Sequence, residues 1–543
     1  MTARVLALVV LLAASLQAQV TFDRILHPEK EPQNWLSYSG SLFNQRFSPL
    51  TQITTANVKN LELQWIWQAK SLEKYEATSI VVDGVLYTVQ APNDVVALDA
   101  VTGRPYWTFT YENLPDARNC CGRVNRGVAV LGDMVYMGTL DAHLLALDAK
   151  TGRLLWKTQV AKTGERYAIT HAPTIVKDKV IVGTAGGDFG ARGVVAAFDA
   201  KTGKEVWRIH TIPGPGEPGN DSWSGDSWKT GGAGVWNSGA YDPETNLVFF
   251  GTGNPAPDWD GRSRLGDNLY SDSVLALDAD TGALKWHYQF TPHDEVDYDS
   301  TQVPVLADIN WPVGAASSRS GQQMVRRKVM LWANRNGLSY VLDRVTGEFL
   351  LGRPFVKVNW MDGFDPKGRP QRVPGKVPTR EGAMVMPTVL GATNWAPPSY
   401  SPRTNLFYVG AWENTGTVLT EGLSPRAVGR NPMGQSTLTA NLNKQDDGYG
   451  VIRALDPQTL EKKWDFPMND ITWGGVLTTA GDVLFSGGKE GYFFALDART
   501  GALLWKMALG GQINSGPMSY SVNGRQYVTV AAGTGLFTFA LRP

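Results

Sequence analysis

The stretch ALDAKTGRLLW, residues 146–156, decides the fold because its pattern recurs along the chain. Strong copies of the form A-x-D-x-x-T-G-x-x-x-W end at Trp107, Trp156, Trp207, Trp286 and Trp505. Weaker copies end at Leu351, Trp464 and Trp65. Between the copies lie short runs in which apolar and polar residues alternate, a period typical of β-strands. The sequence therefore predicts eight units, each made of four short antiparallel strands.

Repeated small sheets favour one architecture, because a single four-stranded sheet cannot bury its own faces and must stack on neighbours around an axis. Eight copies predict an all-β fold, an eight-bladed β-propeller. We expect this single domain to span residues 19–543. Longer insertions lie between Trp207 and Trp464, and the polar segment at residues 420–450 is rich in turn residues. These stretches are expected to form loops on a face, where functional residues gather.

The repeated Asp and Trp have structural explanations. The Asp can accept backbone hydrogen bonds within the D-x-x-T-G turn, and the Trp can fill the gap between blades. We interpret the following carboxylates as structural: Asp99, Asp148, Asp199, Asp278 and Asp497. Chemistry is therefore sought among the carboxylates that lie outside the repeat.

The N-terminus MTARVLALVVLLAASLQAQV has one positive charge, an apolar run and then small residues, which is the layout of a secretory signal peptide. We predict a signal peptide at residues 1–18, cleaved after Ala18, and a periplasmic protein. No later segment approaches the apolar length needed to cross a bilayer, so no transmembrane segment is expected. Lys+Arg and Asp+Glu balance at 51 each without a basic run, which argues against nucleic acid as a partner.

Cys120 and Cys121 are adjacent and are the only two cysteines in 543 residues. A bridge between neighbours removes little chain entropy, so stability is a poor reason for it. An oxidising compartment would nevertheless allow the bridge to form. From the residues alone, the doublet is either two unpaired, half-buried thiols or a functional pair.

The repeat, the cysteine doublet and the strings TGNPAPDW, HDEVDYD and NRNG together resemble the pyrroloquinoline quinone (PQQ) dependent alcohol dehydrogenases. The likeness is to the soluble periplasmic type, similar to methanol and ethanol dehydrogenases, and it spans nearly the whole mature chain. Eight blades with tryptophan-docking repeats characterise that family. In it a ring formed by adjacent cysteines lies on one face of the quinone and a tryptophan on the other. The resemblance implies that Cys120 and Cys121 are bonded and that Trp236 is the second plate.

The resemblance implies further cofactor contacts, because PQQ carries three carboxylates that demand donors and cations. The residues at matching positions are Glu76, Arg126, Thr170, Ala185, Gly186, Gly187, Asn394 and Trp473, with Arg335 placed to hold the reactive quinone oxygen. Taken singly, several have ordinary explanations. Thr170 would suit any strand, and Arg126 would suit a solvated surface.

The resemblance also implies a hard cation bound by Asp188, Asn254 and Asp297, with Asp297 as the general base. Oxygen ligands suit a calcium-like ion, and the lack of clustered His or Cys disfavours zinc or copper. Asp299 lies two residues beyond Asp297, so on an extended segment both side chains would point to one side. This fourth ligand favours a lanthanide over Ca²⁺, although Asp299 could instead cap a surface turn.

Two positions depart from the family. Glu usually occupies the position of Asp188, so the ligand here is one methylene shorter. Trp commonly precedes the catalytic Asp, whereas this chain has Val296, expected beside the substrate.

The resemblance implies oxidation of a small alcohol to an aldehyde or ketone, with hydride passing to the quinone. The chain has no C-x-x-C-H haem signature, so electrons would pass to an external acceptor such as a soluble cytochrome c. Two alternatives remain. A non-catalytic propeller scaffold that binds protein partners explains the repeats equally well, and a quinoprotein sugar dehydrogenase would differ only in its pocket.

Overall fold

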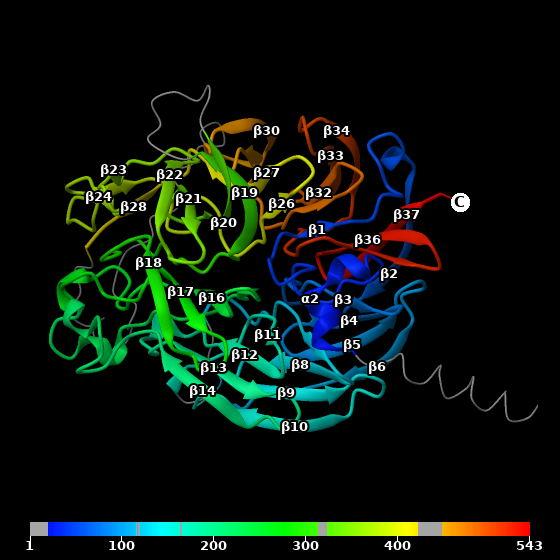
Figure 1. Ribbon diagram of the computed structural model, residues 1–543, viewed down its shortest axis with the longest axis horizontal. Helices are drawn as coiled ribbons and strands as arrows, with labels where there is room; N and C mark the ends of the chain where they lie inside the picture. The colour runs from blue at the N-terminus through cyan, green and yellow to red at the C-terminus, as the bar shows by residue number, and fades with distance from the viewer. Residues whose placement is uncertain are drawn as a thin grey trace, which may run out of the picture.

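Among its described residues, the computed structural model forms eight large sheets that follow one another around a central axis in chain order (Figure 1). The structure describes residues 20–115, 117, 120–162, 165–312, 323–421 and 448–542. The predicted signal peptide at residues 1–18 lies outside these ranges, as does most of the predicted loop at 420–450. The eight-bladed β-propeller that the repeats predicted is confirmed.

Each blade is built on four antiparallel strands, and in seven of the eight blades these four strands follow one another across the sheet in sequence order. The first five blades each take four consecutive strands. Blade 1 has β3 (Ile80–Val82), β4 (Val85–Gln90), β5 (Asp94–Asp99) and β6 (Pro105–Phe109). Blade 2 has β7 (Ala129–Leu131), β8 (Met134–Gly138), β9 (His143–Asp148) and β10 (Leu154–Gln159). Blade 3 has β11 (Thr174–Val176), β12 (Lys179–Gly183), β13 (Val194–Asp199) and β14 (Glu205–His210). Blade 4 has β15 (Ala240–Asp242), β16 (Leu247–Gly251), β17 (Ser273–Asp278) and β18 (Leu284–Gln289). Blade 5 has β19 (Val305–Pro312), β20 (Met324–Ala333), β21 (Leu338–Asp343) and β22 (Phe349–Pro354).

The last three blades depart from this simple order. Blade 6 has β26 (Ser399–Ser401), β27 (Leu406–Glu413), β29 (Tyr449–Leu455) and β30 (Lys462–Met468). Blade 7 has β31 (Leu477–Thr479), β32 (Val483–Gly487), β33 (Tyr492–Asp497) and β34 (Leu503–Ala508), with β1 (Phe47–Ser48) added parallel to β31. Blade 8 has β35 (Met518–Val522), β36 (Arg525–Ala532), β37 (Gly535–Leu541) and β2 (Leu61–Gln68).

The remaining elements are short. Two small hairpin-like pairs lie in the insertions, formed by β23 (Met361–Phe364) with β24 (Pro370–Arg372) and by β25 (Ala383–Val385) with β28 (Thr417–Leu419). The helical pieces are α2 (Phe22–Leu26), η1 (Pro28–Lys30), η2 (Val58–Asn60), η4 (Gly187–Phe189), η5 (Asn220–Ser222), η6 (Ser227–Thr230) and η7 (Gly261–Ser263).

The ring closes through a strand from the other end of the chain. β2 pairs antiparallel with β37, with Leu61 opposite Leu541 and Gln68 opposite Gly535. In Figure 1 the blue β2 accordingly lies beside the red β37. Because the outer strand of blade 8 comes from before blade 1, the propeller closes only when both ends of the chain are in place.

Tryptophans on outer strands dock onto the next blade. Nε1 of Trp107 donates to the carbonyl of Ala149 at 3.1 Å, and a Cβ added to Gly152 would lie 2.5 Å from the Trp107 ring. Gly152 has φ +72°, a conformation in which glycine carries no penalty. The same indole donation joins four more pairs of blades, through Trp65, Trp156, Trp207 and Trp464. The predicted packing role of the repeat tryptophan is confirmed at these junctions.

The repeat aspartates tie their own turns. Oδ1 of Asp148 accepts from the backbone N–H of Thr151 at 2.8 Å and from its hydroxyl at 2.8 Å. The backbone donation to Asp recurs at Asp99, Asp199, Asp278 and Asp497. The structural interpretation of these five carboxylates is confirmed.

One junction uses a different pair of residues. Blade 5 presents Leu351 where other blades have Trp, and blade 6 has Leu460 where the strong copies of the repeat have Gly. Leu460 is buried, and Leu351 packs against the same hydrophobic cluster. A leucine side chain thus fills the space that an indole ring over glycine fills elsewhere.

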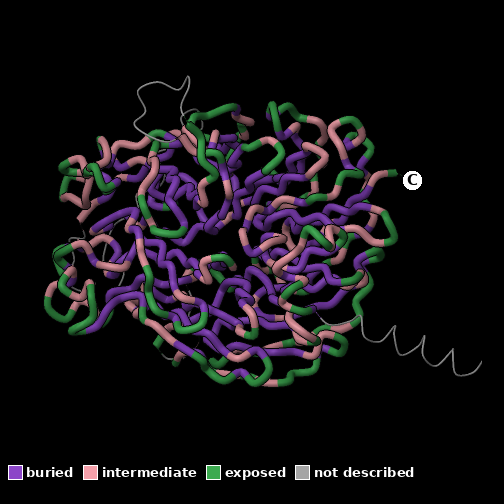
Figure 2. The backbone as a smooth tube through the Cα atoms, in the orientation of Figure 1, coloured by how far each residue is buried: buried purple, intermediate pink, exposed green. Residues whose placement is uncertain are grey.

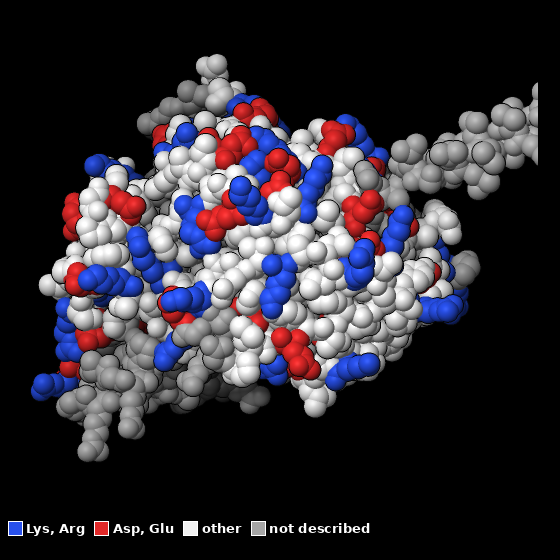
Figure 3. Space-filling model, turned by 90° about the horizontal axis from the view of Figure 1, so that it is seen from below, with Lys and Arg blue, Asp and Glu red and all other residues white. Residues whose placement is uncertain are grey.

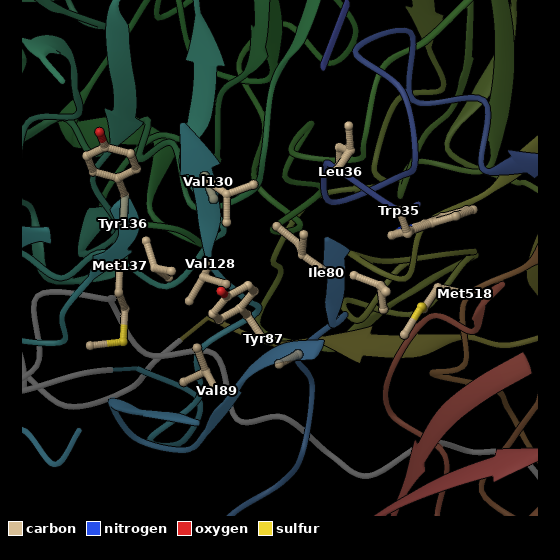
Figure 4. Packing of buried hydrophobic residues seen from close by; sticks show 14 of the residues in the cluster. Trp35, Leu36, Ile80, Tyr87, Val89, Val128, Val130, Tyr136, Met137 and Met518 are labelled. Atoms are coloured by element: carbon tan, nitrogen blue, oxygen red, sulfur yellow. The ribbon is translucent and has the colours of Figure 1, made fainter. Parts of the chain in front are cut away.

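Buried residues fill the interior of the propeller and exposed residues lie toward the perimeter (Figure 2). Figure 4 shows Trp35 and Leu36 of the N-terminal segment near Ile80 of blade 1 and Met518 of blade 8, all in one cluster. Positive and negative side chains alternate over the face in Figure 3, as the balanced composition suggested. In the described part of the chain, no helix is both long and apolar enough to span a membrane.

Candidate active site

A cavity of about 410 Å³ lies where the blades meet at one end of the axis. Each of the eight connections that lead from one blade to the next supplies at least one lining residue. The predicted site residues that line it are Glu76, Cys120, Cys121, Arg126, Thr170, Ala185, Gly186, Asp188, Trp236, Asp297, Asp299, Arg335, Asn394 and Trp473. The structure therefore gathers most of the predicted residues around one space.

Cys120 and Cys121 form a disulfide, so the interpretation of the doublet as two unpaired thiols is wrong. Cys121 is exposed and adopts a positive φ of 67°. Both sulfur-bearing residues line the cavity. The bridge thus presents a rigid surface to the space rather than joining distant parts of the fold.

Arg126 is held between two aromatic rings. Its guanidinium carbon lies 5.1 Å from the centre of the Trp236 ring and 4.8 Å from that of Trp395. Nη1 donates to Oγ1 of Thr170 at 3.1 Å, and Nη2 lies 2.9 Å from Oε2 of Glu76. Burial raises the pKa of Glu76, and the Arg126 charge opposes this shift. A fixed buried cation of this kind suits an anionic ligand.

Aromatic rings continue along this wall. Trp473 stacks with Trp395 at 6.5 Å between ring centres and meets Trp412 edge-on at 4.7 Å. Asn394 donates from Nδ2 to the carbonyl of Leu390 at 2.8 Å. The sequence interpretation missed Trp395, although its place directly after Asn394 was a usable signal.

The acidic end of the cavity contains Asp188, Asp297 and Asp299. Nη2 of Arg335 lies 3.1 Å from Oδ2 of Asp297, and Nη1 donates to Oδ2 of Asp299 at 2.5 Å. Oδ1 of Asp297 is buried without a hydrogen-bond partner. Burial raises the pKa of Asp297 well above its usual range, while the Arg335 charge lowers it. Burial, reinforced by the charge of Asp299, raises the pKa of Asp188 to about 6.

The loop that carries these carboxylates is tied down by a residue the sequence interpretation missed. Asp294 accepts from the backbone N–H groups of Val296 and Tyr298, at 2.9 and 2.6 Å. Asp297 has φ +78°, so the expectation of an extended segment here is wrong, although Asp297 and Asp299 do converge on Arg335. Asp299 is buried, so it does not cap a surface turn.

Val296 is buried in a hydrophobic cluster and does not line the cavity. That Val296 lies beside the substrate stays a prediction, and the described cavity lining does not include this residue. Because Asp294 fixes the backbone on both sides, the residue before Asp297 turns into the core.

Two predicted residues lie behind the cavity wall. The backbone N–H of Asn254 donates to Oδ1 of Asp299 at 2.8 Å, and its Nδ2 donates to Oδ1 of Asp258 at 2.8 Å. Gly187 packs against the backbone of Gly234, which an added Cβ would approach at 3.1 Å. Asp258, another buried carboxyl that the sequence interpretation missed, follows Asn254 by four residues.

The chemistry of this end fits a hard cation beside an anionic cofactor. Carboxylate and amide oxygens are the donors present, and Oδ1 of Asp297 lacks a partner. In the described part of the chain no three His, Cys, Asp or Glu side chains converge closely enough to hold a metal by themselves. A cation would thus need ligands beyond these carboxylates, such as an amide or a cofactor oxygen.

Comparison with known proteins agrees with this geometry. The family model described as "PQQ: Glucose/ethanol/alcohol dehydrogenase, beta-propeller domain" matches residues 35–361 and 436–528. The quinoprotein alcohol dehydrogenase PedH of Pseudomonas putida is 39% identical over 97% of this chain and 90% of its own length.

Two solved structures are similar throughout. The quinohemoprotein alcohol dehydrogenase of Comamonas testosteroni superposes with a TM-score of 0.88 at 34% identity, covering 97% of this chain and 84% of that one. A europium-containing methanol dehydrogenase superposes with a TM-score of 0.87 at 31% identity, covering 96% and 100%. Fold and site thus define a quinoprotein propeller. The chain belongs to the PQQ-dependent alcohol dehydrogenase family.

Proposed function

We propose that this protein oxidises alcohols with PQQ bound in the cavity. The observation that carries the proposal is a single space lined by the Cys120–Cys121 disulfide, the Arg126 guanidinium and the Asp297–Arg335 pair. When bound, PQQ accepts a hydride from the alcohol carbon, and a calcium or lanthanide ion beside it polarises the quinone carbonyl.

The cofactor would be held from both faces and at its edge. The disulfide and Trp236 supply the two flat surfaces, and Arg126 and Thr170 supply donors to the carboxylates. Further contacts come from Glu76, Ala185, Gly186, Gly187, Asn394 and Trp473. Such a rigid arrangement fixes the reactive carbon of the quinone relative to the protein's base.

The cation would be held by oxygens at the acidic end. We assign Asp188, Asn254, Asp297 and Asp299 as its ligands. Asp188, Asp297 and Asp299 line the same end of the cavity, which supports the assignment. Arg335 donates to Oδ2 of Asp299, and the backbone N–H of Asn254 donates to Oδ1. These two hydrogen bonds fix the position of the Asp299 carboxylate.

Asp297 is the general base. Its unpartnered Oδ1 is the atom that would take the hydroxyl proton of the alcohol. Arg335 favours the charged, proton-accepting form of Asp297 through the 3.1 Å contact to Oδ2. Arg335 also keeps a positive charge at the end of the cavity where negative charge develops in the transition state.

Electrons leave to an external acceptor, for which a soluble cytochrome c is our candidate. Both cysteines of this sequence are used in the disulfide, so within these 543 residues none remains to attach a haem covalently. We place the reaction in the periplasm, because of the signal-like residues 1–18. Reduction of a purified c-type cytochrome on addition of alcohol would test the acceptor.

The test of the function uses purified protein supplied with PQQ, calcium or lanthanum, and an artificial electron acceptor. Primary and secondary alcohols should be oxidised, with no activity when PQQ is omitted. If PQQ-loaded protein oxidises none of these alcohols, the proposal fails and the non-catalytic scaffold becomes the favoured alternative. If it oxidises only sugars, the alcohol class is wrong and the quinoprotein chemistry stands.

A further inference from the structure

We propose that Lys74 and Arg166 are a pair of carboxylate-binding cations at the mouth of the cavity, which capture and retain the anionic cofactor. The inference rests on the proposed PQQ chemistry. Neither residue belongs to the repeat, and both line the cavity. The predicted set of cofactor contacts contains neither of them.

Their place in the fold puts them on either side of the disulfide. Lys74 lies between β2 and β3, the cysteines lie between β6 and β7, and Arg166 lies between β10 and β11. These are three successive connections from an outer strand to the next inner strand. Equivalent connections in a propeller emerge on the same face. The two cations therefore flank the disulfide at the cavity mouth.

Lys74 and Arg166 have no ion-pair partner among the residues that the structure describes. Within the described residues, neither Lys74 nor Arg166 has a carboxylate within ion-pairing distance, whereas Arg126 pairs with Glu76 and Arg335 pairs with two aspartates. The charge of Lys74 reaches inward, since it lowers the pKa of Glu76 against the effect of burial. Two positive charges that lack an ion-pair partner among the described residues thus line the same cavity as Arg126.

Arg166 is positioned rather than free. Its guanidinium carbon lies 5.2 Å from the centre of the Phe189 ring, and the residue is half-buried. Its backbone has φ +69°, and its carbonyl would lie 2.3 Å from a Cβ added to Gly186. Since Gly186 lines the cavity, Arg166 is held directly against the cavity wall.

The charge balance of the cavity explains what these cations would bind. The described lining contains Lys74, Arg126, Arg166 and Arg335 against Glu76, Asp188, Asp297 and Asp299. Arg126 is shared with Glu76, so it alone cannot neutralise the three carboxylates of PQQ. Lys74 and Arg166 would add two positive charges toward this balance. They would also steer the anion inward, because unscreened charges raise association rates.

The experiment measures PQQ binding directly, by quenching of tryptophan fluorescence in cofactor-free protein at fixed calcium or lanthanum. Trp236, Trp395 and Trp473 line the cavity and act as probes. Lys74→Met and Arg166→Met should each raise the Kd for PQQ about tenfold, which is about 1.4 kcal/mol. The association rate should fall with added salt in the wild type and depend less on salt in the double variant.

The matched control is the double variant Lys150→Met and Lys201→Met, which removes two exposed charges from repeat turns. It should bind PQQ as the wild type does. Lys74→Arg and Arg166→Lys, which keep the charge, should largely preserve affinity and exclude a folding defect as the cause.

An unchanged Kd in the Lys74→Met, Arg166→Met double variant would overturn the proposal. A raised KM for alcohols that bear a carboxylate, with unchanged PQQ affinity, would also overturn it and assign the cations to substrate. Tight PQQ binding without turnover in the wild type would count against the proposed function only.

Discussion

Oδ2 of Asp297 lies 3.1 Å from Nη2 of Arg335, while Oδ1 of the same carboxylate is buried without a partner. Burial raises the pKa of Asp297 well above its usual range, and the guanidinium opposes this shift by favouring the charged form. One oxygen is anchored and the other is left to react. This division is what a positioned general base requires.

Asp297→Asn should keep the fold and PQQ binding but lose turnover, because an amide has the same shape and cannot accept the proton. We expect kcat to fall by about a hundredfold or more, the usual contribution of a general base. Asp280→Asn makes the same chemical change on an exposed repeat turn and should leave kcat unchanged. Near-normal kcat in Asp297→Asn would mean that another group is the base.

The Cys120–Cys121 bridge should matter for activity more than for stability. A bridge between neighbours constrains the unfolded chain little, so replacing both cysteines with serine should change the free energy of unfolding by no more than about 1 kcal/mol. Turnover should fall severely, because the rigid surface against the cofactor is lost. Mass spectrometry of the unreduced wild type should find no thiol that can be alkylated, and two such thiols would refute the bridge.

The metal preference depends on Asp299. Three carboxylates, Asp188, Asp297 and Asp299, exceed the negative charge that a divalent ion needs, so we expect a trivalent ion to be favoured. Metal-stripped protein given PQQ should regain more activity with lanthanum or cerium than with calcium. Asp299→Ala should abolish that preference. Full activity with calcium, none with lanthanides, and indifference to the substitution would reject the idea.

Tryptophan docking should be measurable as a steric cost at glycine. Gly152→Ala places a Cβ 2.5 Å from the Trp107 ring and should destabilise the protein by about 2–4 kcal/mol, the combined cost of positive φ and overpacking. Gly510 has a similar φ of +76° with no atom near an added Cβ. Gly510→Ala should therefore cost only about 1–2 kcal/mol. If both variants lose the same free energy of unfolding, the Trp107 ring moves aside for the added Cβ without an energetic cost.

His171 should make stability depend on pH. Its Nε2 accepts from the backbone N–H of Gly183 at 2.9 Å, and burial lowers its pKa from 6.5 to about 4. The unfolded chain therefore binds this proton at higher pH than the folded one. The contribution of His171 is complete above pH 6.5 and is lost as pH falls toward 4, by about 3 kcal/mol at most.

His171→Gln isolates this effect, because glutamine cannot be protonated in that range. The variant should be less stable at neutral pH, and the gap to the wild type should narrow between pH 6.5 and 4. Urea unfolding at several pH values measures both curves. Two curves that stay parallel would show that His171 does not titrate in this way.

The sequence by itself determined the propeller and its number of blades. The repeat succeeds as a signal because its interactions are local or periodic: Asp148 binds the turn three residues on, and Trp107 reaches a glycine one blade away. The sequence also shows that the junction between blades 5 and 6 differs, because Leu351 replaces Trp and Leu460 replaces Gly there. Most of the residues that the resemblance to the quinoprotein family singled out line one cavity.

Tertiary structure alone decided how the site is assembled. The lining residues extend from Lys74 to Asn514, and they meet only because β2 closes the ring against β37. No local pattern reports that Arg126 lies between Trp236 and Trp395, or that Lys74 and Arg166 lack ion-pair partners among the described residues. These relationships depend on which connections become neighbours in space, and ring closure sets that arrangement.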